Sequence, residues 1–168
     1  VPFMERLFEL ALGSSNGRDM QSGYVGMITA NSFMKREFGK KLIQDSLPQW
    51  TLTRVIDTAG AYIPGHGTPT VILFGRREQP GDAPVPAVLG IRGEPTTPDD
   101  PSNGKVWASI RDNFAKLGFE PSGEMLRDCA ARNNKARCLT YRLTRERALA
   151  FLCPDFGAPS FIPAGGLG

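Results

Sequence analysis

The short loop between two apolar runs constrains the fold of this chain more than any other feature. Residues 52–57 and 69–75 are both apolar and bounded by turn residues, as buried strands are, and only residues 58–68 separate them. Parallel neighbours need a crossover of roughly a dozen or more residues, usually a helix. This loop is rich in glycine and too short for one. We therefore predict that the two strands pair in the antiparallel direction.

Two amphipathic segments flank a third apolar run, residues 23–29, which also predicts a buried strand. Residues 3–12 predict a helix that ends at Gly13. The apolar residues of that helix expected in the core are Phe3, Leu7, Leu10 and Ala11. The second predicted helix starts at Asn31 or Ser32, either of which can cap it, and Pro48 stops it beyond Leu47. Its expected core stripe is Met34, Phe38 and Leu42.

The second half of the chain contains more loop. Residues 80–104 hold six of the fourteen prolines and predict an irregular connection with one short strand at 85–91. Residues 105–114 predict a modest helix, and residues 124–152 are expected to be mainly helical. The segment 154–168 is expected to be a disordered tail.

Positive charge is concentrated in one segment. The net charge of the chain is +3, but residues 127–147 alone carry seven Lys/Arg against two Asp/Glu. The remainder is slightly negative, which excludes a protein that coats nucleic acid with a uniformly basic surface. Two interpretations of the basic segment stay open, a contact with phosphates or an ordinary solvent-exposed face.

Cysteine usage and hydropathy bound the location of the chain. Cys129, Cys138 and Cys153 are odd in number and show no CxxC spacing, which argues against a disulfide framework and a cysteine zinc site. A cytoplasmic location is therefore expected. No apolar run has the length of a membrane span and no signal peptide is seen, so no membrane partner is expected. Because the sequence starts at Val1 rather than Met, we expect a piece of a longer protein.

Independent catalytic or metal sites find little support in the residues. His66 is the only histidine, and no GxSxG elbow surrounds a serine. The glycines on either side of His66 precede a strand rather than a helix, so they cannot form a dinucleotide-binding turn. Asp99 and Asp100 are expected to lie in a solvated turn. No metal site is predicted, and a hydrolase is disfavoured.

Several segments resemble one enzyme family. Residues 23–42 closely resemble the part of adenine-specific (N6) DNA methyltransferases that follows their catalytic Asn-Pro-Pro-Tyr/Phe motif. Residues 55–75 are similar to one subgroup, the PglX methyltransferases of BREX (phage growth limitation) phage-defence systems. Residues 88–95 and 105–107 extend this resemblance, which covers about residues 1–112.

The resemblance implies an α/β fold. This fold is the C-terminal half of a class I (Rossmann-like) methyltransferase sheet with a terminal antiparallel strand, followed by a loop-rich and helical extension. Strands 23–29 and 52–57 would be parallel neighbours, with strand 69–75 inserted antiparallel between them. The implied organisation is a partial methyltransferase catalytic domain at 1–79, a Pro-rich connection at 80–104, a mainly helical extension at 105–153 and a disordered tail at 154–168.

The activity implied by the resemblance is methyl transfer from S-adenosylmethionine to adenine N6 in DNA, in phage defence. This chain has neither the methyl-donor loop of the family nor its Asn-Pro-Pro-Tyr motif. No catalytic and no cofactor-binding residue is therefore predicted, and the chain alone is expected to be inactive. The implied partners are double-stranded DNA and other phage-defence proteins. The alternative is a non-catalytic, methyltransferase-like module for DNA recognition or scaffolding.

The resemblance also implies where DNA would bind. Ligands of open α/β sheets gather at the carboxyl ends of parallel strands. Tyr62 lies where the family carries an aromatic residue that stacks on the flipped adenine. The residues predicted to bind the target base are Tyr62, Asn31 and Ser32. The residues predicted to contact DNA elsewhere are Lys35, Arg36 and His66.

Overall fold

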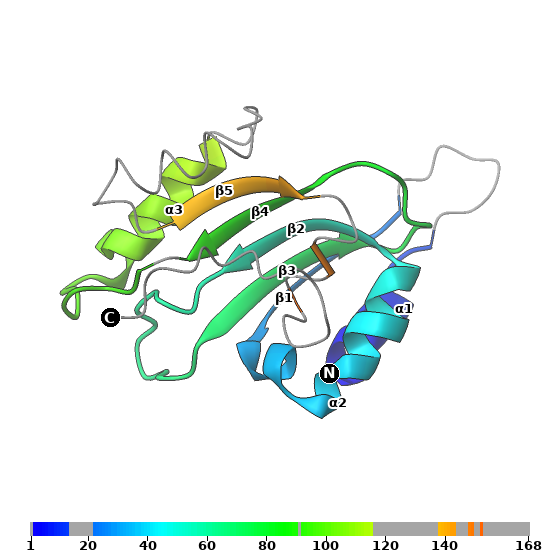
Figure 1. The fold of residues 1–168 in the computed structure, drawn as a ribbon, viewed down its shortest axis with the longest axis horizontal. Helices are drawn as coiled ribbons and strands as arrows, with labels where there is room; N and C mark the ends of the chain where they lie inside the picture. The colour runs from blue at the N-terminus through cyan, green and yellow to red at the C-terminus, as the bar shows by residue number, and fades with distance from the viewer. Residues whose placement is uncertain are drawn as a thin grey trace.

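A five-stranded mixed sheet forms the centre of the protein, which we describe from a computed structural model (Figure 1). The structure describes residues 2–13, 22–90, 92–115, 138–143, 148–149 and 152. In chain order the elements are α1 (Pro2–Leu10), β1 (Tyr24–Ala30), η1 (Asn31–Lys35), α2 (Glu37–Lys41), η2 (Leu42–Ser46), η3 (Leu47–Gln49), β2 (Thr51–Asp57), β3 (Thr70–Arg76), β4 (Val85–Gly90), η4 (Pro101–Asn103), α3 (Lys105–Ala115) and β5 (Cys138–Leu143).

The strand order is β1-β3-β2-β4-β5. Both β1 and β2 pair with β3 in the antiparallel direction, so β1 and β2 run parallel to each other with β3 between them. This arrangement is the one predicted for strands 23–29, 52–57 and 69–75. Strand β4 joins β2 in parallel, through the pairs Val55↔Ala87 and Ile56↔Val88. The mixed α/β class is thereby confirmed, and the methyltransferase fold itself stays a prediction.

Strand β5 corrects one expectation for the second half of the chain. Residues 124–152 are predicted to be helical, but Cys138–Leu143 pair antiparallel with β4 along its whole length. Residues 148 and 149 are helical as predicted. Most of the basic segment, Cys129, Cys153 and the predicted tail lie outside the described residues.

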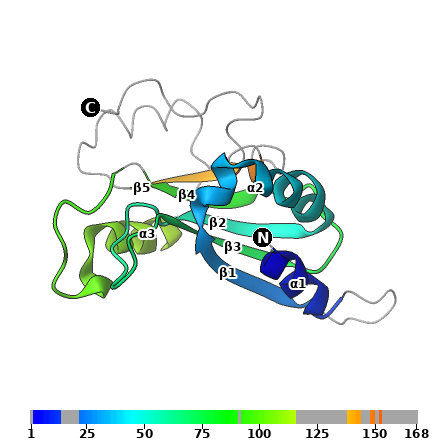
Figure 2. The ribbon, with the colours of Figure 1, turned by 90° about the horizontal axis from the view of Figure 1, so that it is seen from below.

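Helical segments cover both faces of the sheet (Figure 2). On one face, Leu42, Ile43 and Leu47 pack with inward residues of β2 and β3 in the larger core cluster. On the other face, Val106 and Ile110 of α3 pack against Ile56 of β2 and Val88 of β4. Since neighbouring residues of one strand point to opposite faces, Val55 and Ile56 enter different clusters. Helix α3 is thus fixed against the sheet beside the end of β2.

Helix α1 buries a different face from the predicted one. Met4 and Phe8 are 1% and 2% exposed, and Ala11 packs against the same cluster. Phe3, Leu7 and Leu10 are instead 79%, 40% and 66% exposed. The ring of Phe8 stacks on Trp50, with ring centroids 5.7 Å apart. This stack places Phe8 beside Gly75 of β3, where there is no side chain to exclude it.

The second predicted helix is broken rather than continuous. Arg36 has an extended backbone, with φ −129° and ψ 146°, and separates η1 from α2. No side-chain hydrogen bond caps η1, so the predicted capping role of Asn31 or Ser32 is wrong. Met34 and Leu42 are buried as predicted, whereas Phe38 is 54% exposed. The straight helical spacing fails because the chain turns at Arg36.

Candidate functional site

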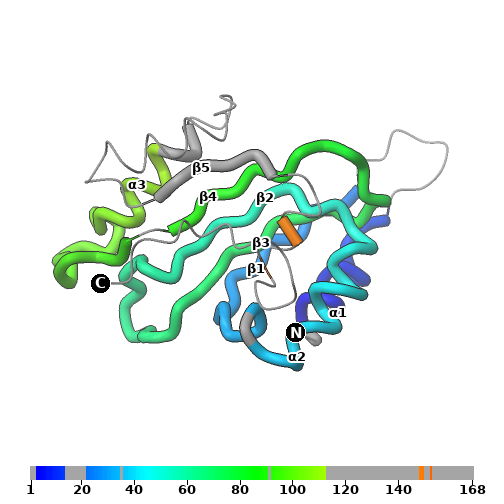
Figure 3. The backbone as a smooth tube through the Cα atoms, in the orientation of Figure 1, coloured from blue at the N-terminus to red at the C-terminus, as the bar shows by residue number. Residues whose placement is uncertain are grey.

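The loop between β2 and β3 lies at the carboxyl ends of β1 and β2 and is anchored there on both sides (Figure 3). The Thr58 N–H donates to the Thr70 carbonyl at 3.1 Å, and the buried hydroxyls of these two threonines lie 2.7 Å apart. The Asn31 N–H donates to the Pro69 carbonyl at 2.9 Å. The predicted edge of the sheet therefore does bring Asn31 beside the end of this loop.

The first half of the loop is a tight turn that carries Tyr62. The Asp57 carboxylate accepts the Ala59 N–H at 2.9 Å, and the Thr58 carbonyl accepts the Ala61 N–H at 3.0 Å. Such local side-chain and backbone bonds are typical of turns that begin at Asp. The side chain of Tyr62 is half-buried. Its position is thus set by a structured turn and not by a long free loop.

The second half of the loop carries His66 at an exposed tip. The His66 N–H donates to the Ile63 carbonyl at 3.1 Å, and these two residues form an isolated antiparallel bridge. Gly65 closes the tip with φ +68°, a conformation that glycine adopts without the steric cost of a side chain. His66 is exposed, as a contact with DNA requires, but its role stays a prediction.

Helix α3 holds the same turn from the other side. The Trp107 indole Nε1–H donates to the Tyr62 carbonyl at 3.0 Å, and the Glu94 N–H donates to the Gly60 carbonyl at 3.0 Å. Neither Trp107 nor Glu94 has a role predicted from the sequence. Both lie in segments of the resemblance, which is the only signal in the sequence that points to them.

A shallow hollow opens beside Tyr62. Its volume is about 500 Å³, and its lining comes from residues 59–62 and 93–97. Tyr62 contributes an aromatic ring to this lining, and Thr96 and Thr97 contribute hydroxyl groups. Glu94 also lines the hollow, but its carboxylate accepts N–H groups at the start of α3. The hollow therefore combines an aromatic ring with hydrogen-bonding groups, as sites for a planar polar ligand do.

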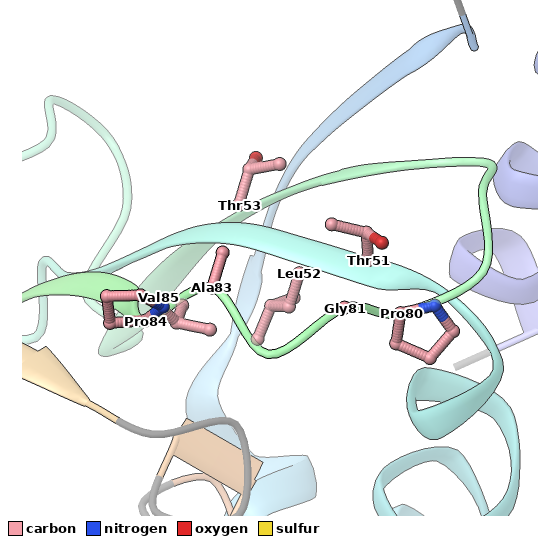
Figure 4. A pocket seen from close by; sticks show the side chains of 8 residues that line it. All are labelled: Thr51, Leu52, Thr53, Pro80, Gly81, Ala83, Pro84 and Val85. Carbon is pink, nitrogen blue, oxygen red and sulfur yellow. The ribbon is translucent and has the colours of Figure 1, made fainter.

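A second hollow lies near the start of β2, at the opposite end from Tyr62 (Figure 4). Its volume is about 180 Å³. The residues that line it are Thr51, Leu52, Thr53, Pro80, Gly81, Ala83, Pro84 and Val85. Since none of these side chains titrates near neutral pH, the hollow offers no acid, base or charged anchor, and we assign it no function.

The remaining predicted site residues lie along η1 and the break that follows it. Asn31 and Ser32 are half-buried at the start of η1, and Lys35 is its last residue. The prediction that Arg36 lies in the first turn of a continuous helix is wrong, because Arg36 is exposed at the break between η1 and α2. Among the described residues, no hydrogen bond joins Tyr62 to Asn31 or Ser32. The predicted base-binding set therefore occupies two neighbouring parts of one sheet edge.

The glycines of the Tyr62 loop do not form a site that fits S-adenosylmethionine. The backbone of Gly93 occupies the space beside Gly60, since a Cβ added at Gly60 would lie 2.7 Å from the Gly93 Cα. That space is therefore closed to a ligand. Gly65 and Gly67 are exposed at the loop tip and lead into a strand, not into a helix that could face a charged ligand.

The part of the chain that the structure describes also lacks a metal-binding group and a membrane helix. No three His, Cys, Asp or Glu in it cluster as metal ligands, and no helix in it is long and apolar enough to span a bilayer.

Asp100 caps η4, where it accepts the Ser102 N–H at 2.9 Å. This backbone hydrogen bond, with a second from the Ser102 hydroxyl, lowers the pKa of the Asp100 carboxyl.

Comparison with curated proteins gives a clear relative. Over 121 residues the chain is 52% identical to the adenine-specific methyltransferase PglX of Streptomyces coelicolor. The chain is a relative of PglX over most of its length. The match covers 70% of this chain and 10% of PglX, so the chain spans about a tenth of the relative. The resemblance to PglX that the sequence indicates is confirmed.

Two further comparisons add little. No family model matches the chain. Among solved structures, a chain from a study of complex assembly and conformational transition in the type I R-M system has a TM-score of 0.43 and 17% identity. That likeness covers 89% of this chain and 30% of the other, and it is too weak to carry an argument.

Proposed function

We propose that this chain is part of an adenine-specific DNA methyltransferase, in which it forms the side of the active site that holds the target base. One observation carries the proposal, the 52% identity to PglX over 121 residues. The complete protein would transfer a methyl group from S-adenosylmethionine to adenine N6 in double-stranded DNA and act in phage defence.

The geometry of the Tyr62 loop supports this role. An enzyme that modifies a base must extract it from the duplex, and an aromatic face in the pocket compensates part of the lost stacking. Tyr62 borders an open hollow at the edge of the sheet where ligands of α/β proteins bind. Asn31 and Ser32, which follow β1 on the other side of β3, would contact the base or its sugar.

This chain would depend on the rest of the protein for catalysis. It contains no Asn-Pro-Pro-Tyr motif, and the glycines of its Tyr62 loop do not fit the methyl donor. We therefore expect the 168-residue chain to be inactive by itself.

The test compares the complete protein with the isolated chain. Each is incubated with duplex DNA and isotopically labelled S-adenosylmethionine, and N6-methyladenine is measured by mass spectrometry of the digested DNA. The complete protein should form N6-methyladenine, and the isolated chain should not. A complete protein that binds duplex DNA without methylating it would instead support the non-catalytic recognition or scaffold module.

Lys35 and Arg36 are predicted to contact phosphates in the complete protein. Each lost phosphate contact should weaken DNA binding and reduce the slope of log K against log salt concentration by about 1. The variants are Lys35→Ala and Arg36→Ala, and binding is measured at several salt concentrations. Lys41→Ala is the matched control, because Lys41 is exposed but lies a turn further along. If Lys35→Ala and Arg36→Ala leave affinity and slope unchanged, both residues belong to a solvated face.

A further inference from the structure

Two hydrogen bonds from outside the Tyr62 loop hold its backbone in place. The Glu94 N–H binds the Gly60 carbonyl and the Trp107 indole binds the Tyr62 carbonyl, each at 3.0 Å. These carbonyls lie on either side of Ala61. Because the backbone is held at both points, the direction in which the Tyr62 side chain leaves the loop is fixed relative to α3.

The carboxylate of Glu94 connects this contact to the start of α3. It accepts the Lys105 N–H at 3.0 Å and the Val106 N–H at 2.6 Å. The first N–H groups of a helix have no partner within the helix, and a carboxylate there also interacts favourably with the helix dipole. Glu94 therefore binds the loop through its backbone and α3 through its side chain.

Two glycines make close approaches in this arrangement, and the one at Gly60 is to backbone. A Cβ at Gly60 would lie 2.7 Å from the Gly93 Cα, and a Cβ at Gly104 would lie 2.7 Å from Glu94 Oε1. The loop is thus packed backbone to backbone against Gly93, while the start of α3 lies against the Glu94 carboxylate. We call Gly60, Gly93, Glu94, Gly104 and Trp107 the α3 clamp.

The α3 clamp forms part of the wall of the hollow beside Tyr62. Gly60, Gly93 and Glu94 of the clamp line that hollow together with Tyr62. Val106 and Ile110 of α3 pack against the sheet at Ile56 and Val88. Because α3 is fixed to the sheet, the clamp also holds the loop in place relative to the sheet. Stacking on a base needs an aromatic ring held in one orientation before the base arrives, since ordering it on binding would lower affinity.

We propose that Glu94 and Trp107 are positioning residues that hold Tyr62 in the orientation in which it stacks on the target base. The inference rests on the proposed function, because it assigns Tyr62 to the base. Neither residue touches the base itself in this proposal. Both act through the backbone of residues 60–62.

The first experiment tests the clamp in the 168-residue chain. Trp107→Phe keeps an aromatic ring but removes the indole N–H, and Glu94→Gln removes the charge and one acceptor. Amide hydrogen exchange at Ala61, whose N–H binds the Thr58 carbonyl, reports opening of the loop. Each variant should speed this exchange about two- to tenfold, the effect of one lost hydrogen bond.

The controls Trp50→Phe and Glu37→Gln lie elsewhere in the fold and should leave the exchange rate of Ala61 unchanged. Unchanged exchange in both clamp variants would overturn the proposal.

The second experiment tests whether the clamp acts through Tyr62. In the complete methyltransferase, Trp107→Phe should lower the rate of N6-methyladenine formation about two- to tenfold, without changing the salt dependence of DNA binding. In a Tyr62→Ala background, Trp107→Phe should have no further effect, since a positioning residue loses its role with the side chain that it positions. Additive effects of the two substitutions would show that Trp107 does not act through Tyr62. A wild-type complete protein without activity would overturn the proposed function, whereas the exchange result would still stand for the clamp.

Discussion

Replacing Tyr62 by alanine in the complete methyltransferase is expected to lower productive DNA binding or turnover about 5- to 150-fold. Stacking of a base on an aromatic side chain contributes about 1–3 kcal/mol, and each 1.4 kcal/mol corresponds to about a factor of ten. Tyr62→Phe should cost little, because the ring rather than the hydroxyl makes this contact. The measurement is the rate of N6-methyladenine formation at limiting and at saturating DNA.

Tyr24→Ala is the matched control for this prediction. Tyr24 is 69% exposed at the start of β1, where it lies against the guanidinium of Arg76 and away from the loop. Its loss should leave the rate near that of the wild type. If Tyr62→Ala and Tyr62→Phe both behave like the wild type, Tyr62 only packs against the rim of the sheet. The target base would then bind elsewhere.

The relative direction of β2 and β3 was predictable from the sequence because it depends on the length of the loop that connects them. The loop of residues 58–68 is too short for a crossover helix, which leaves an antiparallel pair of β2 and β3. The position of β3 between β1 and β2 came from the resemblance rather than from local pattern. Strand β5 was missed because its partner, β4, lies about fifty residues earlier in the sequence, and no local pattern records such a pairing.

The buried face of α1 could not be chosen from periodicity. This nine-residue helix is apolar on two sides, since Phe3, Leu7 and Leu10 form one stripe and Met4 and Phe8 form another. The choice is made by the surface opposite, where Gly75 leaves space for the Phe8 ring and Trp50 stacks on it. A helical pattern shows which residues share a face, and the tertiary partner decides which face is buried.

The candidate site was predictable only where chain order places residues at a strand end. Asn31 follows β1 directly and Tyr62 lies five residues after the end of β2, so both were placed at the carboxyl edge of the sheet, and their roles there stay predictions. Glu94 lies 34 residues beyond Gly60, whose carbonyl its N–H binds. Trp107 lies 45 residues beyond Tyr62, whose carbonyl its indole N–H binds. A carboxylate that caps a helix usually comes just before it, whereas Glu94 caps α3 from across a loop. Three-dimensional contact was needed to find both.

Gly39→Ala is expected to destabilise the fold by at least about 2 kcal/mol, at the upper part of the range for overpacked sites. Gly39 is buried in α2, and an added Cβ would lie 1.7 Å from the Phe33 carbonyl oxygen. That obstacle is backbone, so it cannot rotate away, and α2 would have to move off η1. The movement would draw Phe33 or Leu42, which are 3% and 2% exposed, out of the core.

Helix propensity alone predicts the opposite result, since alanine is favoured over glycine inside a helix by about 1 kcal/mol. Urea unfolding of the 168-residue chain, followed by circular dichroism, therefore decides between local propensity and tertiary packing. Gly67→Ala is the matched control, because nothing lies within 4 Å of a Cβ at Gly67. It should change stability by less than about 1 kcal/mol. A Gly39→Ala chain at least as stable as the wild type would show that α2 does not pack on η1 in this way.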